Sequence, residues 1–355
     1  MAAVRWTPPA NPAPVRRRGD VRTLPELRRI ELPGAGPEHI AVDAWGTLFA
    51  GLADGRIVRV MPEGEVRIVT NTGGRPLGME VLGDDRLLVC DAVRGLLEVQ
   101  LSNGTVEVLA SKADGERLTF CSNVAAGPDG AIYFTQSSRR YNLDEYRGEL
   151  LEHSGTGRLL RLGADGAVET VADGFAFANG LVLLDGGAGD GADGGAGGGS
   201  EGGSGGSGTS GTSAIVAETG GYCLTRVALT GPDAGSKTPF GPPLAGFPDN
   251  LTRDAQGLIW IAMPNPRDPM LDWLLPRHPR LRHAVWSTPE RLQPGEKDLA
   301  WAIALDAHGT VVRDLRGWEV GYKMVTAARR RGDTLYLGSL TERAIALVDL
   351  DPGEP

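Results

Sequence analysis

A short pattern of apolar and polar positions recurs along the chain. Each copy has an apolar pair, a turn rich in Asp and Gly, and then a β-branched or aromatic stretch. Continuous copies occupy 40–51, 80–91, 124–136, 251–263 and 325–340, and a sixth copy is split between 180–186 and 214–220. Two such stretches joined by a turn of this kind predict a β-hairpin. Another short strand is predicted after several copies, at 55–60, 95–101 and 157–162.

The spacing of the copies predicts the fold class. Gly46 and Asp85 are 39 residues apart, and Asp85 and Gly130 are 45 apart. A period of about 40–50 residues with several strands per unit is typical of a β-propeller. Six copies therefore predict an all-β, six-bladed β-propeller, with a β-sandwich as the alternative. The expected organisation is an N-terminal extension (1–30), a single propeller (31–350) and a short tail (351–355).

Two insertions interrupt this pattern. Residues 186–213 are rich in Gly and Ser and have few apolar groups to bury, so we expect a flexible, disordered surface loop. Residues 264–300 contain the apolar pieces MLDWLL and LRHAVW, which predict short helices interrupted by Pro276 and Pro279. This second insertion is expected either to cover the channel mouth as a lid or to pack on the propeller edge.

Composition narrows the classes of partner. Lys and Arg total 36 against 45 Asp and Glu, and the resulting charge of −9 disfavours a nucleic-acid partner. The three cysteines are far apart and form no CxxC motif, so neither a zinc site nor a disulfide framework is indicated. No signal-peptide core or run of about 20 apolar residues is found, so we expect a cytoplasmic protein without a membrane partner. The oligomeric state is left open.

Oxygen-bearing side chains recur where the innermost strand of a repeat is expected to begin. They are Glu38, Asn123, Asn179, Asp249 and Asn250. Asn-Gly and Asp-Asn pairs also form ordinary turns, but recurrence in four repeats predicts that these residues converge on the propeller axis. Two carboxylates and three amides suit a hard cation such as Ca²⁺, with another divalent cation as an alternative. Zinc or copper would require imidazole or thiolate ligands.

The motifs also resemble a known group of proteins. They are GPEHIAVDAWGTLFAGLADGRIVRV, RPLGMEVLGDDRLLVCDAVRGLL, IYFTQSS, FANGLVL and LAGFPDNLTRDAQGLIWIA. Together they are similar to the strictosidine-synthase-like branch of six-bladed propellers, which is related to the paraoxonases and the gluconolactonase (senescence marker protein) group. The resemblance covers about residues 30 to 350, apart from the Gly-rich tract. It implies that the calcium ligands of paraoxonases fall on the same five residues, and the gluconolactonase group supports all of them except Asn250.

The chain departs from this resemblance at two positions. Leu77 stands where paraoxonases carry a catalytic His. The Glu that strictosidine synthase uses as a base aligns near Thr326, and no acidic residue occurs from 325 to 332. Strictosidine synthesis itself is therefore not expected.

The resemblance and the residues together predict a calcium-dependent hydrolase of lactones or related esters, acting on a small-molecule substrate. Asp249 is the first candidate for the base that activates water. His153 is the second, because its loop is long enough to reach the channel mouth, although a solvated loop histidine is the default interpretation. Two alternatives stay open: a condensation or isomerisation in specialised metabolism, and a non-catalytic propeller with a structural calcium ion.

Overall fold

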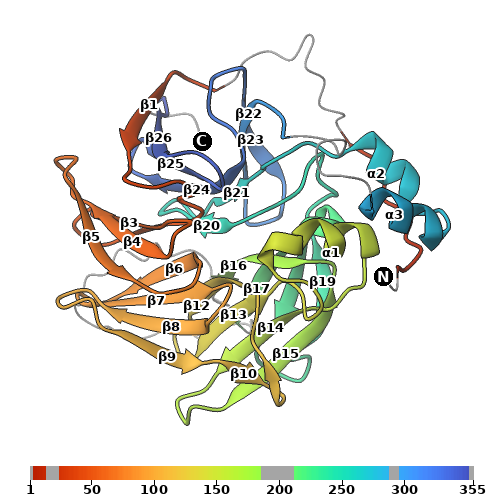
Figure 1. Ribbon diagram of the computed structural model, residues 1–355, viewed down its shortest axis with the longest axis horizontal. Coiled ribbons are helices and arrows are strands. Elements are labelled where there is room, and N and C mark those ends of the chain that lie inside the picture. The colour runs from red at the N-terminus through yellow and green to blue at the C-terminus, as the bar shows by residue number, and fades with distance from the viewer. Residues whose placement is uncertain (1–2, 13–23, 185–211, 288–295, 352–355) are drawn as a thin grey trace, which may run out of the picture.

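The chain folds into six four-stranded antiparallel sheets arranged around a central axis (Figure 1). The computed structural model describes residues 3–12, 24–184, 212–287 and 296–351. The predicted six-bladed propeller is confirmed. All but the last two residues of the expected Gly/Ser-rich loop, 186–213, lie outside the described residues.

The first three blades follow one another along the chain. Blade 1 contains β2 (Ile40–Val42), β3 (Leu48–Gly51), β4 (Arg56–Val60) and β5 (Val66–Asn71). Blade 2 contains β6 (Pro76–Leu82), β7 (Arg86–Asp91), β8 (Gly95–Gln100) and β9 (Val106–Ala110). A small hairpin follows, made of β10 (Lys112–Ala113) and β11 (Glu116–Arg117). Blade 3 contains β12 (Cys121–Ala126), β13 (Ile132–Gln136), β14 (Gly157–Leu162) and β15 (Val168–Phe175).

The second half repeats the arrangement. Blade 4 contains β16 (Ala178–Leu184), β17 (Ser213–Glu218), β18 (Cys223–Ala228) and β19 (Lys237–Phe240), with the short 3₁₀ helix η2 (Thr219–Gly221) between β17 and β18. Blade 5 contains β20 (Leu251–Arg253), β21 (Ile259–Ala262), β22 (Leu299–Leu305) and β23 (Val311–Trp318). Blade 6 contains β24 (Val325–Arg331), β25 (Thr334–Ser339), β26 (Ala344–Asp349) and β1 (Leu27–Glu31).

Each recurring sequence pattern corresponds to the two inner strands of one blade. The split copy forms β16 and β17, so the Gly/Ser-rich insertion interrupts one hairpin of blade 4. Apolar side chains pack between neighbouring blades; Trp260 of blade 5, for example, shares a buried cluster with Val325 and Leu337 of blade 6. Burial between adjacent sheets explains why the strands are rich in β-branched and aromatic residues.

The N-terminal part of the chain closes the ring. Strand β1 pairs with β26 in an antiparallel register from Leu27 opposite Val348 to Glu31 opposite Ala344. The expected boundary between an extension and a propeller beginning at residue 31 is therefore wrong, because it falls inside a strand of blade 6. This strand was missed because its partner lies at the other end of the chain.

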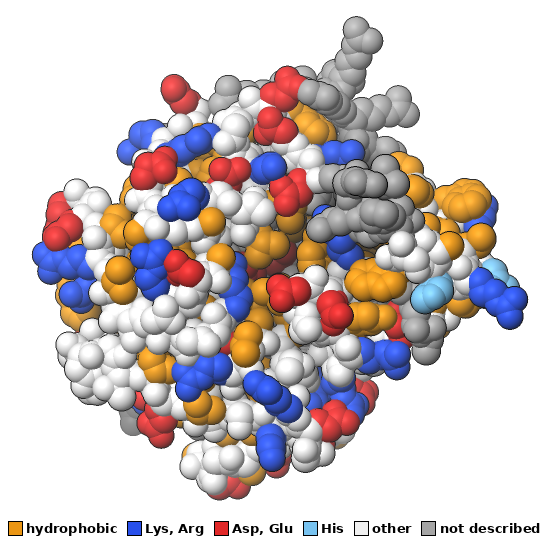
Figure 2. Space-filling model, viewed as in Figure 1, with side chains coloured by type: hydrophobic (Ala, Val, Ile, Leu, Met, Phe, Trp, Pro, Cys, Tyr) orange, Lys and Arg blue, Asp and Glu red, His pale blue; other side chains and the backbone are white. Residues whose placement is uncertain are grey.

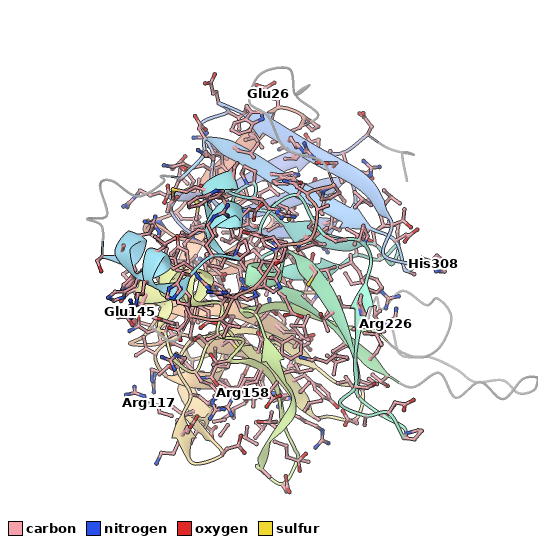
Figure 3. The ribbon with its side chains drawn as sticks, turned by 90° about the vertical axis from the view of Figure 1, so that its right-hand side faces the viewer. Glu26, Arg117, Glu145, Arg158, Arg226 and His308 are labelled. Carbon is pink, nitrogen blue, oxygen red and sulfur yellow. The ribbon has the colours of Figure 1, made fainter. Side chains whose placement is uncertain are left out.

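Short helices cover one face of the propeller. The 3₁₀ helix η1 (Leu143–Glu145) and α1 (Tyr146–Glu152) follow β13, and α2 (Pro269–Leu274) and α3 (Pro279–Trp286) follow β21. Figures 1 and 3 together show α1, α2 and α3 on the same face, while His308 lies at the opposite side in Figure 3. The two helices expected within 264–300 are therefore present. No helix of the described residues is long and apolar enough to cross a membrane.

Local sequence explains where α2 and α3 begin. Asp268 accepts hydrogen bonds from the backbone N–H groups of Met270 and Leu271, and His278 accepts one from Arg280. Each of these N-cap residues is followed by a proline, Pro269 or Pro279. Proline at the first helical position has no N–H to leave unsatisfied, so the pair of residues defines the helix start.

Residues 3–12 form a strap along these helices. Val4 N donates to Glu152 O at 3.0 Å, and Trp6 N donates to Leu275 O at 3.3 Å. The buried Arg282 of α3 donates to Leu151 O, Glu152 O and Val4 O. The strap therefore links the C-terminal ends of α1 and α2 to α3.

Candidate functional site at the propeller axis

The inner strands of four blades are bulged at equivalent positions. The pairing register shifts across residues 77–78 in β6, 122–123 in β12 and 179–180 in β16, and at Thr326 in β24. A β-bulge bends its strand and changes the direction of a side chain. The bulges therefore distinguish the axial end of each inner strand, where the predicted site residues stand, from the regular ladder below it.

Glycines allow these strands to approach one another closely. A Cβ atom at Gly180 would lie 2.4 Å from both Asp249 O and Leu251 N, and one at Gly78 would lie 2.5 Å from the Cα of Asn123. Real Cβ atoms do not make such contacts with backbone. The Asn-Gly pair at 179–180, which is typical of a turn in sequence, instead has its glycine where blade 5 lies against blade 4.

The structure brings all five predicted cation ligands together. Asn123 Nδ2 donates to Asn250 Oδ1 at 2.7 Å, and Asn250 Nδ2 donates to Glu38 Oε1 at 2.8 Å. Asn179 Nδ2 donates to Asp249 Oδ1 at 3.0 Å. All five residues are buried. These contacts join blades 1, 3 and 5 in one hydrogen-bonded chain and blades 4 and 5 in another.

A cavity of about 250 Å³ opens above these residues. Its floor has six polar side chains, from Glu38, Ser122, Asn179, Thr219, Asp249 and Thr326. Its lower wall is apolar, with Leu77, Phe120, Phe177, Phe247, Met324 and Leu340. Figure 2 shows this face hollowed near its centre, with hydrophobic side chains around the hollow. Asn123 and Asn250 lie behind the floor and do not line the cavity.

The covering helices complete the cavity. Leu143, Tyr146 and Leu150 line it from the segment containing α1, and residues 264–271 and Val285 line it from the second insertion. Both segments therefore shape the cavity, and of the two alternatives for the second insertion the lining favours a cover over the channel mouth. Arg147 and Lys297 add positive charge, while Asp268 and Glu296 add negative charge.

The floor presents hydrogen-bond acceptors. The hydroxyl groups of Thr219 and Thr326 donate to the carbonyl oxygens of Pro248 and Glu38, each at 2.7 Å. Asn179 Nδ2 donates to Thr219 Oγ1 as well as to Asp249 Oδ1. An amide nitrogen has two hydrogens and a hydroxyl has one. These contacts therefore use the available hydrogens and leave oxygen lone pairs for whatever enters the cavity.

The same argument applies to Ser122. Its Oγ lies 2.6 Å from Ser137 Oγ, and Ser137 Oγ donates to Ala178 O at 2.7 Å. Because Ser137 has a single hydroxyl hydrogen, Ser122 must donate to Ser137. Ser122 is thus another acceptor at the floor.

Burial shifts the titration of the two carboxylates. Burial raises the pKa of Glu38 from 4.5 to about 7, against the opposing effects of Arg75 and the hydrogen bond from Asn250. Burial, followed by the negative charge of Glu38, raises the pKa of Asp249 well above its usual value. Both carboxyl groups are therefore held toward their protonated forms when no cation is present.

The floor fits a hard cation. Glu38 Oε2 is buried and has no hydrogen-bond partner among the described residues, which is costly for an ionised oxygen. A cation would satisfy this oxygen and favour the charged forms of Glu38 and Asp249. The described residues contain no group of three or more His, Cys, Asp or Glu side chains arranged for a metal, so any cation here depends on amide and hydroxyl oxygens as well.

The second predicted catalytic residue does not belong to this site. His153 ends α1 with a positive φ of 53° and its ring stacks on Trp6 with centroids 4.1 Å apart. It does not line the cavity. Burial and then the charge of Arg282 lower its pKa to about 4. The expectation that His153 acts as a base is therefore wrong, because the strap covers its ring.

Three cavity residues were not proposed as site residues from the sequence. Ser122 and Thr219 had no distinguishing signal, since hydroxyl residues are common in strands and turns. Thr326 stood near the position where the resemblance predicts a Glu, and that alignment was the available clue. In all three residues the hydroxyl hydrogen is already donated to another protein atom, and this shared property can be seen only in the structure.

The fold and this site define a class: a six-bladed β-propeller with a cluster of oxygen-bearing side chains at its axis. Residues 22–60 match the family model of the strictosidine synthase-like N-terminal region, and residues 123–188 match that of strictosidine synthase. The adipocyte plasma membrane-associated protein of Danio rerio is 29% identical over 341 residues, covering 89% of this chain and 75% of that protein. Protein strictosidine synthase-like 6 of Arabidopsis thaliana is 28% identical over 323 residues, covering 88% of this chain and 79% of that protein.

Solved structures show the same fold. A gluconolactonase from Xanthomonas campestris has a TM-score of 0.62 at 16% identity, covering 98% of this chain and 99% of that one. The calcium-binding protein regucalcin from Agrobacterium tumefaciens has a TM-score of 0.59 at 14% identity, covering 94% of this chain and 98% of that one. This chain is therefore similar in sequence to strictosidine synthase-like proteins, and it shares its six-bladed β-propeller fold with the gluconolactonase and regucalcin structures.

Proposed function

We propose that the protein is a calcium-dependent hydrolase of lactones or related esters. The observation that carries this proposal is the acceptor-rich floor, with two carboxylates of raised pKa beside one unpartnered carboxylate oxygen. Glu38, Asn179 and Asp249 would hold the cation. Behind the floor, Asn250 donates to Glu38 Oε1 and Asn123 donates to Asn250 Oδ1, so these two amides would hold the Glu38 carboxylate in place for the ion.

A bound divalent cation supplies Lewis-acid polarisation of a substrate carbonyl and stabilises the negative charge that develops on its oxygen. The protein provides the proton transfers. Asp249 accepts a proton from water as the water oxygen bonds to the carbonyl carbon. It then returns that proton to the leaving oxygen as the ester bond breaks. The apolar wall favours a partly apolar substrate, because polar groups placed against it would lose hydrogen bonds to water.

One structural neighbour is a gluconolactonase and another is a calcium-binding protein, and both support this proposal. A second candidate is a non-catalytic propeller in which the ion is structural. It is favoured by the absence of histidine from the described cavity lining, where Leu77 stands in place of the paraoxonase His. The two candidates differ in turnover, while both predict cation binding.

The deciding experiment is hydrolysis of a panel of lactones and aryl esters by the purified protein, with Ca²⁺ and with chelator. We expect turnover that requires Ca²⁺ and falls at least about a hundredfold in Asp249→Asn, since general-base catalysis typically contributes 10² or more. Asp254→Asn is the matched control, because Asp254 is also a buried carboxylate of blade 5 but bonds to Trp260 Nε1 and does not line the cavity. No turnover across the panel, with Ca²⁺ bound, would show that the hydrolase proposal is wrong.

A further inference from the structure

Thr326 belongs to the blade between the two blades that carry the floor carboxylates. Its strand, β24 of blade 6, is flanked by blade 5, which carries Asp249, and by blade 1, which carries Glu38. Thr326 Oγ1 donates to Glu38 O at 2.7 Å, and the Thr326 carbonyl oxygen accepts from Asn250 N at 3.3 Å. The side chain lines the cavity although the residue is only 2% exposed.

The hydrogen-bonding capacity of this hydroxyl is then determined. A threonine hydroxyl has one hydrogen and two lone pairs. The hydrogen is used by Glu38 O, and no described residue donates to Thr326 Oγ1. Toward the cavity, Thr326 can therefore only accept a hydrogen bond.

We propose that Thr326 positions the attacking water of the hydrolysis, with its Oγ1 accepting one water hydrogen while Asp249 accepts the other. This inference rests on the proposed function. In the reaction, the water oxygen bonds to the carbonyl carbon and gives one proton to Asp249. The hydrogen held by Thr326 stays on that oxygen and becomes part of the product carboxyl group, and Asp249 protonates the leaving oxygen as its bond to the carbonyl carbon breaks.

Two acceptors restrict the orientation of a water molecule. When both hydrogens are held, a lone pair is directed away from the protein, toward the space where a carbonyl carbon can sit. Orientation of a reactant in this way lowers the barrier because less rotational freedom is lost during reaction. Thr326 provides this second acceptor without a third negative charge, which a carboxylate at the same position would place beside Glu38 and Asp249.

Ser122 and Thr219 are the other floor hydroxyls that already donate their hydrogen within the protein. Ser122 belongs to blade 3, which is adjacent neither to blade 5 nor to blade 1. Thr219 belongs to blade 4, which is adjacent to blade 5 but not to blade 1, and its Oγ1 already accepts from Asn179 Nδ2. Thr326 is adjacent to both carboxylate-bearing blades, and this placement favours it over Ser122 and Thr219.

The test compares three variants in the calcium-loaded protein. Thr326→Val removes the acceptor and keeps the shape of the side chain, and Thr326→Ser keeps the hydroxyl. Thr252→Val is the matched control: Thr252 is also a buried residue of an inner strand, and its Oγ1 donates to Ala328 O of the neighbouring blade at 2.5 Å, but it does not line the cavity.

We expect Thr326→Val to lower kcat about tenfold or more, the scale of one lost hydrogen bond to a reacting group, while KM changes less than about threefold. Thr326→Ser and Thr252→Val should keep kcat within about threefold of the wild-type value. The rise in melting temperature caused by Ca²⁺ should be the same in all four proteins, which separates an effect on water from an effect on the ion.

Equal kcat values for Thr326→Val and Thr252→Val would overturn the proposal and leave the hydrolase function intact. A wild-type protein without turnover would instead contradict the proposed function, and the role in attack would fail with it. A crystal structure of the calcium-loaded wild type adds a measurement independent of turnover. A cavity without a water at hydrogen-bond distance from Thr326 Oγ1 would also overturn the proposal.

Discussion

Glu38 and Asp249 place two carboxyl groups of different blades at the floor of one buried cavity. Burial is the largest influence on the pKa of each, and the charge of Glu38 adds to the effect on Asp249. Isolated surface carboxylates are ionised at neutral pH, whereas these two resist ionisation in the absence of a cation. Cation binding, pH and stability are therefore linked through the ionisation of these two side chains.

The first prediction concerns the pH dependence of stability without cation. The folded-state pKa of Glu38, about 7, lies above its ordinary value of 4.5, so the folded protein retains this proton longer than the unfolded chain. The contribution of protonated Glu38 to the free energy of unfolding is complete below pH 4.5. It decreases by about 3 kcal/mol as the pH rises to 7. We expect urea denaturation in chelator to show a smaller loss of unfolding free energy from pH 5 to 8 in Glu38→Gln than in wild type.

Calcium should reverse this loss in the wild-type protein, because a cation lowers the folded-state pKa of Glu38. Glu80→Gln provides the matched control: burial also raises the pKa of Glu80 to about 7, but Glu80 does not line the cavity. Ca²⁺ should therefore still stabilise Glu80→Gln at pH 8 and should stabilise Glu38→Gln much less. Equal stabilisation of the two variants would contradict the assignment of the cation to Glu38.

At the scale of elements, the upper part of the cavity is formed by helices that lie outside the propeller sheets. Helices α1, α2 and α3 contribute or flank its upper lining, and the strap of residues 3–12 hydrogen-bonds to all three. Arg267, which follows β21, donates to Pro9 O and forms an ion pair with Asp272 of α2. The strap and the helices are therefore expected to loosen together.

Trp6→Ala tests this coupling. Its indole stacks on His153 at the end of α1 and lies 5.9 Å from the ring of Tyr222. Loss of these contacts should speed hydrogen exchange of α1 and α2 backbone amides about tenfold or more, the equivalent of about 1.4 kcal/mol of local stability, while inner-strand amides keep their protection. Trp45→Ala is the control, since Trp45 is 60% exposed in a turn. Uniform acceleration over the whole chain, or none in the helices, would contradict a local role for the strap.

At the scale of the whole molecule, closure depends on a strand from the opposite end of the chain. Strand β1 covers the outer edge of β26, and the buried Leu24 packs with Trp260 and Leu315. An uncovered β26 would have unpaired backbone groups at an open edge. The ring is therefore closed by hydrogen bonds between the two ends of the chain.

Two truncations test this closure. A chain of residues 24–355 keeps β1, and a chain of residues 32–355 lacks it, while both lack the strap. We expect thermal unfolding of the 32–355 chain to occur at least about 10 °C below that of the 24–355 chain, because loss of several kcal/mol shifts the midpoint of a domain of this size by that amount. Equal midpoints would show that β1 contributes little to the stability of the ring.

The architecture was predictable because its signal is local. Each inner hairpin carries its own alternation and turn, so six copies could be counted without knowledge of their contacts. The helix α1 was not predicted, since YRGELLE is too short to show helical periodicity. Strand β1 was missed because its partner lies more than 300 residues away.

The sequence by itself determined the number of blades and the set of five oxygen-bearing residues at their axial ends. Both follow from the repeated sequence pattern, because each copy can be recognised from residues that are close together in the chain. The tertiary structure decided how those residues are used: Asn250 supports Glu38 from 212 positions away, Asn179 opens to the cavity, and His153 is covered by the strap. It also decided that Thr326 donates its hydroxyl hydrogen to Glu38 O and can therefore only accept a hydrogen bond toward the cavity. Hydrogen-bond partners and burial depend on contacts between blades, and no local pattern encodes them.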